Sequence, residues 1–253
     1  MWDEPLVLGI RTVRSRLIVS ADGYPSAEIM RRAHEASGAE LVTLAVRGLD
    51  AAGSGRPLLE SLGRDRVTIV ATTSGCRTAD EAVRTAYLAR EAGVGELVSV
   101  DVVGDSRTEM PDLPAILEAT KVLTADGFAV LAVAGTDPVA ARRLEDAGAT
   151  AVLVAAAPAG SGLGVSNPYA LRLALESVTV PLIVAGGIGT ASDAARAMEL
   201  GCAGVLVGHA ITGARDPEVM AEAMRLGVEA GRGAYKAGRV SRRLYRDAFG
   251  SPD

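Results

Sequence analysis

Cysteine and lysine are both scarce in this chain of 253 residues. Its two cysteines, Cys76 and Cys202, lie far apart in the sequence and form no CxxC metal-binding pair, and such low cysteine usage suits a reducing cytoplasm. Only Lys121 and Lys236 are lysines among 26 basic residues. Because arginine stays protonated at neutral pH, the sequence offers very few amines for covalent chemistry.

Long apolar runs are absent as well. No stretch of 18 or more apolar residues predicts a membrane span, and the first residues, MWDEPLVLGIRTVRSR, lack the basic head and apolar stretch of a signal peptide. A net charge of −5 argues against non-specific binding to nucleic acid. We therefore expect a cytoplasmic protein that binds neither membranes nor nucleic acid.

Short β-branched runs alternate with longer amphipathic stretches along the chain. Eight strand–helix units within about 230 residues are typical of a (β/α)8 barrel. We predict one α/β domain over 1–253: a TIM barrel over about 16–230, followed by a short basic tail over 231–253. The predicted strands are 16–20, 40–46, 66–72, 96–102, 128–134, 150–156, 181–186 and 203–208. The predicted helices are 25–36, 56–62, 78–92, 112–126, 137–147, 167–177, 191–200 and 216–230.

The strand ELVSVDV (96–102) carries two polar residues where apolar ones are expected. Ser99 and Asp101 alternate with valines, so these two side chains share one face of the strand. Active sites of such barrels lie at the C-terminal ends of the strands. Ser99 and Asp101 are therefore candidate catalytic residues.

Other polar residues also fall at strand ends. His209 follows the eighth strand, where its imidazole could serve as a general acid or base, the alternative being a helix-capping role. Asp22 and Thr72 end the first and third strands and are candidate substrate-binding residues. His34 lies in the middle of a predicted helix, where a surface position is expected.

Glycines follow the last two strands. In VAGGIGTASDAA (184–195), Gly186, Gly187 and Gly189 lead into a helix for which Ser192 is the predicted N-cap, and Gly208 ends the next strand. Glycine lets the backbone approach an anion and direct N–H groups at it, and loops after strands seven and eight of these barrels often hold phosphate. We predict an anion site between these turns and His209. The loop after the sixth strand, with Gly160, Ser161 and Gly162, is either a cover for that ligand or a plain surface loop.

Several segments together resemble bacterial thiamin thiazole synthase, and the similarity runs nearly end to end. They include LVTLAVRGLD, TSGCRTADEAVRTAYLAREAG, APAGSGLGVSNPYALRL and VPLIVAGGIGTASDAARAMELGCAGVLV. The resemblance implies a phosphate-binding, homo-oligomeric TIM barrel. It also implies condensation of deoxyxylulose 5-phosphate with dehydroglycine and with sulfur from a small carrier protein that ends in a thiocarboxylate. The implied chemistry begins with an imine between the sugar ketone and a lysine on strand four, aided by an acid two positions later and an aspartate at the end of strand seven.

The chain departs from that family pattern at its chemistry. Ser99 stands in the position of the lysine, Asp101 keeps the acid in shortened form, and Ala185 replaces the strand-seven aspartate. A hydroxyl cannot form an imine with a ketone. Lys121 in a helix and Lys236 in the predicted tail lie away from the strand ends, so neither is expected to substitute.

Three functions remain open from the sequence. The first is a thiazole-synthase-like enzyme, a transferase or synthase, that acts on a phosphorylated sugar-type substrate without an imine, with Asp101 and His209 moving protons. The second is a non-catalytic paralogue that binds a sulfur-carrier protein or a true thiazole synthase. The third is the thiazole synthase of thiamin biosynthesis with an altered active site. No cofactor and no metal site is predicted.

Overall fold

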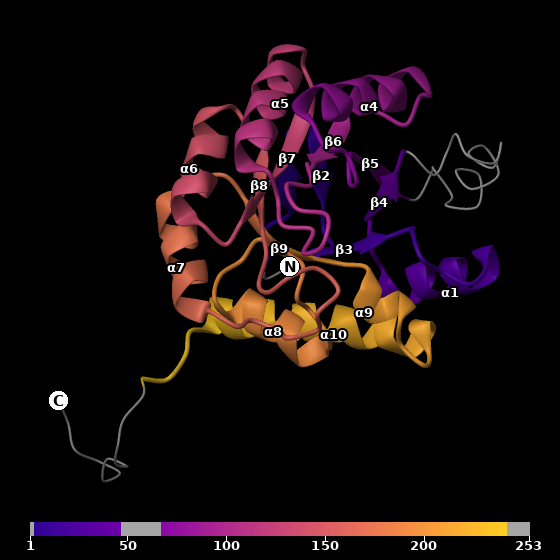
Figure 1. The fold of residues 1–253 in the computed structure, drawn as a ribbon. Coiled ribbons are helices and arrows are strands. Elements are labelled where there is room, and N and C mark those ends of the chain that lie inside the picture. The colour runs from indigo at the N-terminus through magenta and orange to yellow at the C-terminus, as the bar shows by residue number, and fades with distance from the viewer. Residues whose placement is uncertain (1–2, 47–66, 242–253) are drawn as a thin grey trace, which may run out of the picture.

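The eight predicted parallel strands close into a barrel with helices around it, which confirms the predicted fold class (Figure 1). The computed structural model describes residues 3–46 and 67–241, so the predicted helix over 56–62 lies outside the described residues. Neighbouring strands follow the order β10-β3-β4-β5-β6-β7-β8-β9, and the sheet has no free edge. The barrel strands are β3 (Leu17–Ser20), β4 (Leu41–Ala45), β5 (Thr68–Thr72), β6 (Leu97–Val100), β7 (Ala129–Gly135), β8 (Ala151–Val154), β9 (Leu182–Ala185) and β10 (Gly204–Val207).

Capping residues start the helices close to the predicted positions. The helices of the described part are α1 (Ala27–Ser37), α4 (Ala79–Glu91), α5 (Leu113–Ala125), α6 (Pro138–Asp146), α7 (Pro168–Ser177), α8 (Ala191–Glu199), α9 (His209–Thr212) and α10 (Pro217–Ala237). Asp112, Asp137 and Asn167 accept hydrogen bonds from first-turn amides, with proline in the first turn that follows each. Most boundaries differ from prediction by one or two residues, and two differences concern a cap and a longer helix. Thr190, not Ser192, is the N-cap of α8, and α10 continues to Ala237, so the first part of the predicted tail is helical.

Side chains alternate along the strands between the barrel interior and the layer under the helices. This alternation follows from the two-residue period of a strand. Val98 and Val100 of β6 belong to the outer core beneath the helices. The inner core is a separate cluster that includes Ile18, Leu41, Val70, Leu97, Leu131, Leu153 and Ile183.

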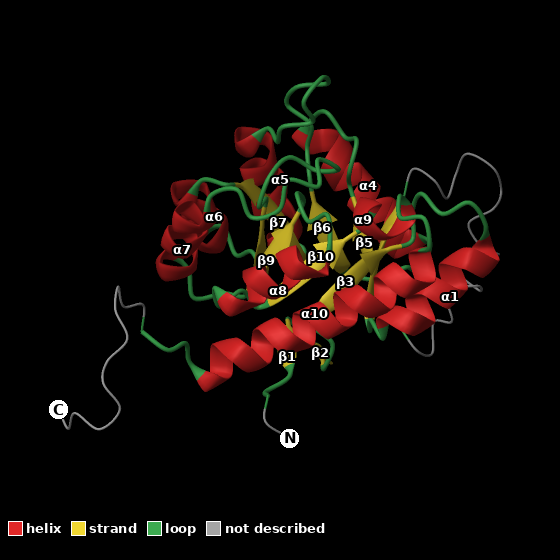
Figure 2. Ribbon diagram, turned by 90° about the horizontal axis from the view of Figure 1, so that it is seen from below, coloured by secondary structure: helices red, strands yellow, loops and turns green. Residues whose placement is uncertain are grey.

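An N-terminal hairpin, which the sequence analysis did not predict, closes one end of the barrel. Strands β1 (Leu6–Leu8) and β2 (Arg11–Val13) are antiparallel and are joined by the two-residue turn Gly9–Ile10. Figure 2 shows them at one end of the barrel, close to the N-terminus. Leu6, Leu8 and Val13 are buried in the inner cluster. The hairpin therefore supplies the apolar floor of the barrel.

An ion-pair network fastens this hairpin to the barrel. The Arg16 guanidinium, only 7% exposed, donates to Asp3 at 2.7 Å and to the carbonyl oxygen of Ala203 at 2.8 Å. Arg232 of α10 donates to the same Asp3 carboxylate at 2.9 Å. Burial alone would raise the pKa of Asp3, but the hydrogen bonds and charges of Arg232 and Arg16 outweigh burial and lower the pKa to about 2.

Replacing Asp3 with asparagine should destabilise the fold in a pH-dependent way. A carboxyl pKa lowered from 3.8 to about 2 corresponds to about 2 kcal/mol of stability. That contribution is complete above the unfolded-state pKa and is lost as the pH falls from 3.8 towards 2. Urea unfolding should therefore show Asp3→Asn less stable than the wild type by about 2 kcal/mol at neutral pH, with the difference vanishing in strong acid. Glu4→Gln, at an exposed neighbour, is the control, and an Asp3→Asn deficit that is the same at both pH values would contradict this role.

Candidate active site at the barrel mouth

Ser99 lies on the inner face of β6. It is two residues beyond Leu97 of the inner core, it is 4% exposed, and it pairs in register with Thr72 of β5. Asp101 follows the end of the strand and is half-buried. The hydroxyl, the carboxylate and Thr72 therefore occupy neighbouring positions at the C-terminal end of the barrel.

Thr73 fixes the backbone of Asp101, and the sequence analysis missed it. Its buried hydroxyl donates to the carbonyl oxygen of Asp101 at 2.7 Å and accepts from the amide of Asp101 at 2.9 Å. The amide of Thr73 donates to the carbonyl oxygen of Ser99 at 3.0 Å. One threonine thus holds both candidate residues in place. A buried threonine directly after a strand, beside the polar Thr72, was the available signal.

The surroundings of Asp101 favour its protonated form. Burial raises the pKa of Asp101, and the nearby charge of Glu109 raises it further, whereas a long hydrogen bond of 3.5 Å from Ser74 opposes the shift. Glu109 is the one non-glycine residue with positive φ, +53°, among the described residues. A carboxyl group with a raised pKa at a barrel mouth is suited to acid–base chemistry.

A second carboxylate stands at the rim after β3. Asp22 accepts hydrogen bonds from the Ala45 amide at 3.2 Å and from the Ser20 hydroxyl at 3.3 Å. Burial raises the pKa of Asp22, and these hydrogen bonds partly oppose the increase. Behind it, the Nε2 atom of His34 lies 3.1 Å from the Ser20 carbonyl oxygen. His34 is half-buried there, so the expectation of a surface histidine is wrong.

His209 and Asp101 stand on opposite sides of the mouth. His209 is exposed and begins α9 after β10, whereas Asp101 follows β6, and these two strands lie four positions apart in the closed barrel. Asp22 lies after β3, next to β10. The two candidate acid–base residues, Asp101 and His209, and the candidate substrate-binding residue Asp22 are therefore not one cluster, and they could meet the same ligand only across the mouth.

The predicted anion-binding glycines come together in three adjacent loops. The Gly164 amide donates to the Gly187 carbonyl oxygen at 2.8 Å, which joins the loop after β8 to the loop after β9. A methyl group built on Gly162 would touch Gly189 at 3.7 Å, and one on Gly160 would come within 4.0 Å of the His209 ring. The loops after β8, β9 and β10 therefore form one side of the mouth.

Close packing explains why Gly187 is a glycine. Its φ is +80°, and a Cβ atom there would lie 2.4 Å from the backbone nitrogen of Ala157. Any larger residue at Gly187 would therefore disturb the packing of this loop. Gly208 differs, because a Cβ atom there would lie 3.2 Å from the Cβ atom of Ser20, a tight but adjustable contact.

Asp193 places a negative charge of the chain itself at the start of α8. One oxygen of its carboxylate accepts from the amides of Gly189 and Thr190, each at 3.1 Å. This capping residue was not predicted, although Thr-x-x-Asp is close to the capping-box pattern. A phosphate bound here would have to use neighbouring donors or displace Asp193.

The described residues offer no metal centre and no membrane-spanning helix. No group of three or more His, Cys, Asp or Glu side chains within them could hold a metal ion. None of the helices in the same ranges is long and apolar enough to cross a membrane.

The family model and the curated relatives point to one family. The model of "Thiazole biosynthesis protein ThiG" matches residues 7–252. Thiazole synthase of Myxococcus xanthus is 50% identical over 97% of this chain and 95% of its own length, and that of Acidithiobacillus ferrooxidans is 49% identical over 100% and 98%. Among solved structures, the Amycolatopsis orientalis BexX/CysO complex contains a chain with a TM-score of 0.87 and 36% identity, covering 96% of this chain and 100% of that one.

Two glycine variants should separate loop packing from anion binding. Gly187→Ala should reduce the free energy of unfolding by about 2 kcal/mol or more, because the methyl group clashes with Ala157 and the residue needs positive φ. Gly208→Ala should cost less than about 1 kcal/mol and yet weaken binding of inorganic phosphate roughly tenfold. Chemical denaturation and isothermal titration calorimetry measure the two effects. Unchanged phosphate affinity in Gly208→Ala would exclude the β10 turn from the anion site.

Proposed function

The chain belongs to the ThiG family of thiazole biosynthesis proteins, and on that premise we propose that it is a thiazole-synthase-like enzyme that binds a phosphorylated sugar-type substrate across the mouth of its barrel. The observation that carries the proposal is the division of the mouth into two sides. Glycine-rich loops after β8, β9 and β10 make one side, and Ser99 with Asp101 makes the other. A phosphate held at the loops would direct the sugar carbons towards β6.

The residues support a reaction that does not pass through an imine. The buried Ser99 hydroxyl orients the sugar, and Asp101 moves the proton, since its raised pKa brings the carboxyl group closer to neutral pH. The two lysines lie elsewhere. Lys121 is exposed on α5, and Lys236 is exposed at the end of α10. Tyr235, next to Lys236, packs against Gly201 just before β10 begins, so this end of α10 is far from the C-terminal ends of the strands.

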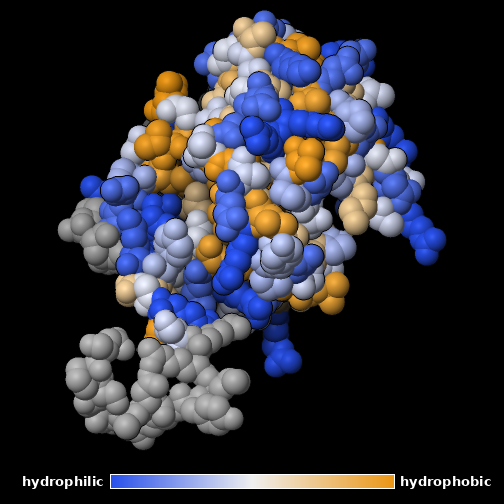
Figure 3. Space-filling view, turned by 90° about the vertical axis from the view of Figure 1, so that its left-hand side faces the viewer, coloured by the Kyte–Doolittle hydropathy of each residue, from blue (hydrophilic) through white to orange (hydrophobic). Residues whose placement is uncertain are grey.

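A small sulfur-carrier protein with a C-terminal thiocarboxylate is the proposed protein partner. In the solved Amycolatopsis structure, a chain similar to this one is in complex with a second protein, which supports a protein partner here. A homo-oligomer is also proposed. The outer face over α6 and α7 carries apolar side chains among hydrophilic ones (Figure 3), with Val139 56% exposed and Leu173 37% exposed.

The close relatives favour one further candidate, thiazole synthase with an altered active site. Identity of about 50% over nearly the whole chain supports it. The two candidates differ in mechanism, because the thiazole synthase chemistry implied by the resemblance requires an amine that Ser99 cannot supply. Mass spectrometry of the reaction products separates the two candidates. One reaction contains deoxyxylulose 5-phosphate, dehydroglycine and the thiocarboxylate carrier, and the other contains glucose 6-phosphate and the carrier.

Asp101 should be more sensitive to substitution than Ser99. Loss of a positioned acid–base group typically costs roughly 10²–10⁴ in rate, so Asp101→Asn should lower kcat by that amount, and Ser99→Ala should lower it less. The acidic limb of the wild-type pH–rate profile should lie above 3.8, the ordinary carboxyl pKa, and should disappear in Asp101→Asn. Asp146→Asn, at the exposed end of α6, is the control. Full activity in Asp101→Asn would remove this carboxylate from the mechanism.

Borohydride reduction should trap no sugar on the protein. A serine hydroxyl gives at most a reversible hemiketal with a ketone, which borohydride cannot convert into a stable amine. After treatment with deoxyxylulose 5-phosphate or glucose 6-phosphate and borohydride, the peptide map should show Lys121 and Lys236 unmodified. Ser99→Lys is the positive control for trapping. A reduced sugar adduct on either native lysine would return the protein to an imine mechanism.

A further inference from the structure

Two layers of side chains line the inside of the barrel just below the mouth, and each layer is polar on one side only. Such barrels stack their inner-face residues in layers of four, drawn from alternate strands. The strand registers place Thr43, Ser99, Leu153 and Leu206 in the lower layer and Ser20, Thr72, Val133 and Ala185 in the upper one. The four residues from β3–β6 carry hydroxyl groups, whereas the four from β7–β10 are aliphatic and belong to the inner core or pack against it.

Thr43, which was not predicted as a site residue, is the neighbour of Ser99 within the lower layer. Thr43 lies two residues beyond the inner-core residue Leu41 on β4, so its side chain faces the barrel interior. It pairs with Val70 of β5, and Ser99 pairs with Thr72, two residues further along the same strand. The tilt of barrel strands produces this stagger, so the side chains of Thr43 and Ser99 stand side by side at one height.

The hydroxyl groups of Thr43 and Ser99 have no protein partner, although both residues are buried. Thr43 is 5% exposed and Ser99 is 4% exposed, and within residues 3–46 and 67–241 the structure gives neither side-chain oxygen a hydrogen bond. In the same ranges, Thr120 of α5 is the one residue whose side-chain oxygen is both sealed from solvent and unpartnered. The oxygens of Thr43 and Ser99 therefore remain accessible from the mouth. Because buried polar groups normally have partners, these two hydroxyls are open for a ligand.

The other two hydroxyls of these layers are already engaged. The Ser20 hydroxyl donates to the Asp22 carboxylate at 3.3 Å, and the Thr72 hydroxyl accepts from the Ser74 amide at 3.2 Å. The aliphatic half of the layers offers no side-chain donor or acceptor. Recognition of a ligand hydroxyl inside the barrel therefore falls to the lower layer on the side of β4 and β6.

We propose that Thr43 and Ser99 together bind a hydroxyl group on the terminal carbon of the substrate, next to its ketone, so that the protein selects a hydroxylated ketose phosphate over a 1-deoxy sugar. The inference rests on the proposed function, in which a phosphate at the loops after β8, β9 and β10 directs the sugar carbons towards β6. A terminal hydroxyl above the lower layer donates to one of the two oxygens and accepts from the other. A methyl group in its place leaves both buried hydroxyls without a partner, which weakens binding.

Isothermal titration calorimetry of the full-length protein with D-xylulose 5-phosphate and 1-deoxy-D-xylulose 5-phosphate tests the proposal, because these sugars differ by one hydroxyl group. The first should bind at least about tenfold more tightly. Thr43→Val, which replaces the hydroxyl with a methyl group, should weaken binding of D-xylulose 5-phosphate by about tenfold and leave binding of the deoxy sugar unchanged. Thr43→Ser keeps the hydroxyl and should keep the preference. Ser99→Ala should reduce the preference as Thr43→Val does, and the double variant should lose little more, because both residues contact one ligand group.

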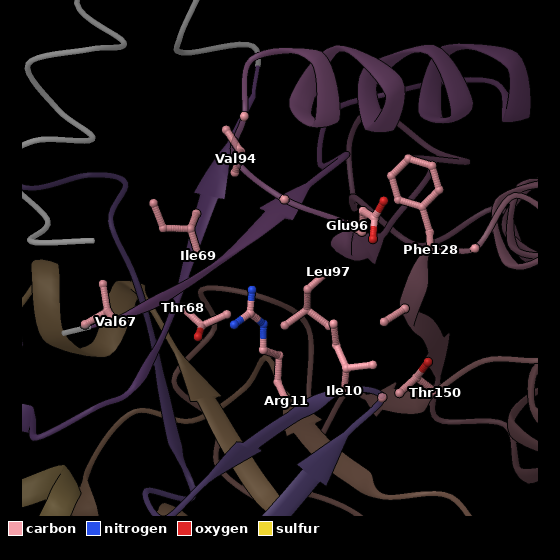
Figure 4. Close-up of a pocket in the computed structure, with 15 residues that line it drawn as sticks. Ile10, Arg11, Val67, Thr68, Ile69, Val94, Glu96, Leu97, Phe128 and Thr150 are labelled. Carbon is pink, nitrogen blue, oxygen red and sulfur yellow. The ribbon is translucent and has the colours of Figure 1, made fainter. Parts of the chain in front are cut away.

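Two further variants locate the effect. Thr68→Val is the matched control, because Thr68 lies on β5 at the opposite end of the barrel, where it lines a cavity together with Arg11 and Leu97 (Figure 4). It should leave the preference unchanged. Gly208→Ala, on the proposed phosphate side of the mouth, should weaken binding of both sugars by the same factor.

The outcomes separate this inference from the proposed function. Equal affinity for the two sugars, a preference for the deoxy sugar, or a preference that survives Thr43→Val would overturn hydroxyl recognition and leave a phosphosugar site in place. The same holds if neither sugar binds but glucose 6-phosphate does. If none of the three sugars binds, the proposed function fails and this inference fails with it.

Discussion

Closure of eight parallel strands is the constraint on which the rest of this structure depends. Once the sheet closes, every second side chain of a strand must face a narrow interior, and only its two ends are open to ligands. Leu97 and Ser99 of β6 show the consequence. Two residues apart on one face, the first belongs to the apolar inner core and the second to the polar mouth. The same geometry holds Asp101 and His209 apart, because β6 and β10 face each other across the barrel.

Close approach of the backbone is the second constraint, and it acts on the proposed phosphate side of the mouth. Gly187 lies against Ala157 so tightly that no side chain fits, and Gly164 is covered by the Asp193 carboxylate. Gly187 and Gly164 are therefore required by the close packing of these loops, whether or not an anion binds. An anion bound here would use backbone N–H donors that the packing already holds rigidly in place. One of these donors, the Gly189 amide, already donates to the Asp193 carboxylate.

The sequence predicted the barrel well because its strands and helices have strong, regular periodicity. Alternation alone also predicted the valine face of segment 96–102, and Val98, Val100 and Val102 do belong to the outer core. Prediction failed where a contact distant in sequence decides the outcome. The hairpin over Leu6–Val13 is stable only against the floor of a finished barrel, and Thr73 acquires its role only when β5 lies beside β6. His34 is half-buried because α1 packs over the end of β3, and the local sequence pattern does not predict this contact.

The N-terminal hairpin also has a consequence for how the chain is made. Residues 3–16 are synthesised well before their partners: Asp3 binds Arg232, and Arg16 binds the carbonyl oxygen of Ala203. Such long-range contacts form slowly, because the whole intervening loop must first close. The floor of the barrel therefore cannot close before Ala203 and Arg232 have been synthesised. Until then, Leu6 and Leu8 lack the apolar partners that cover them in the finished barrel, so this short segment exposes apolar surface in the growing chain.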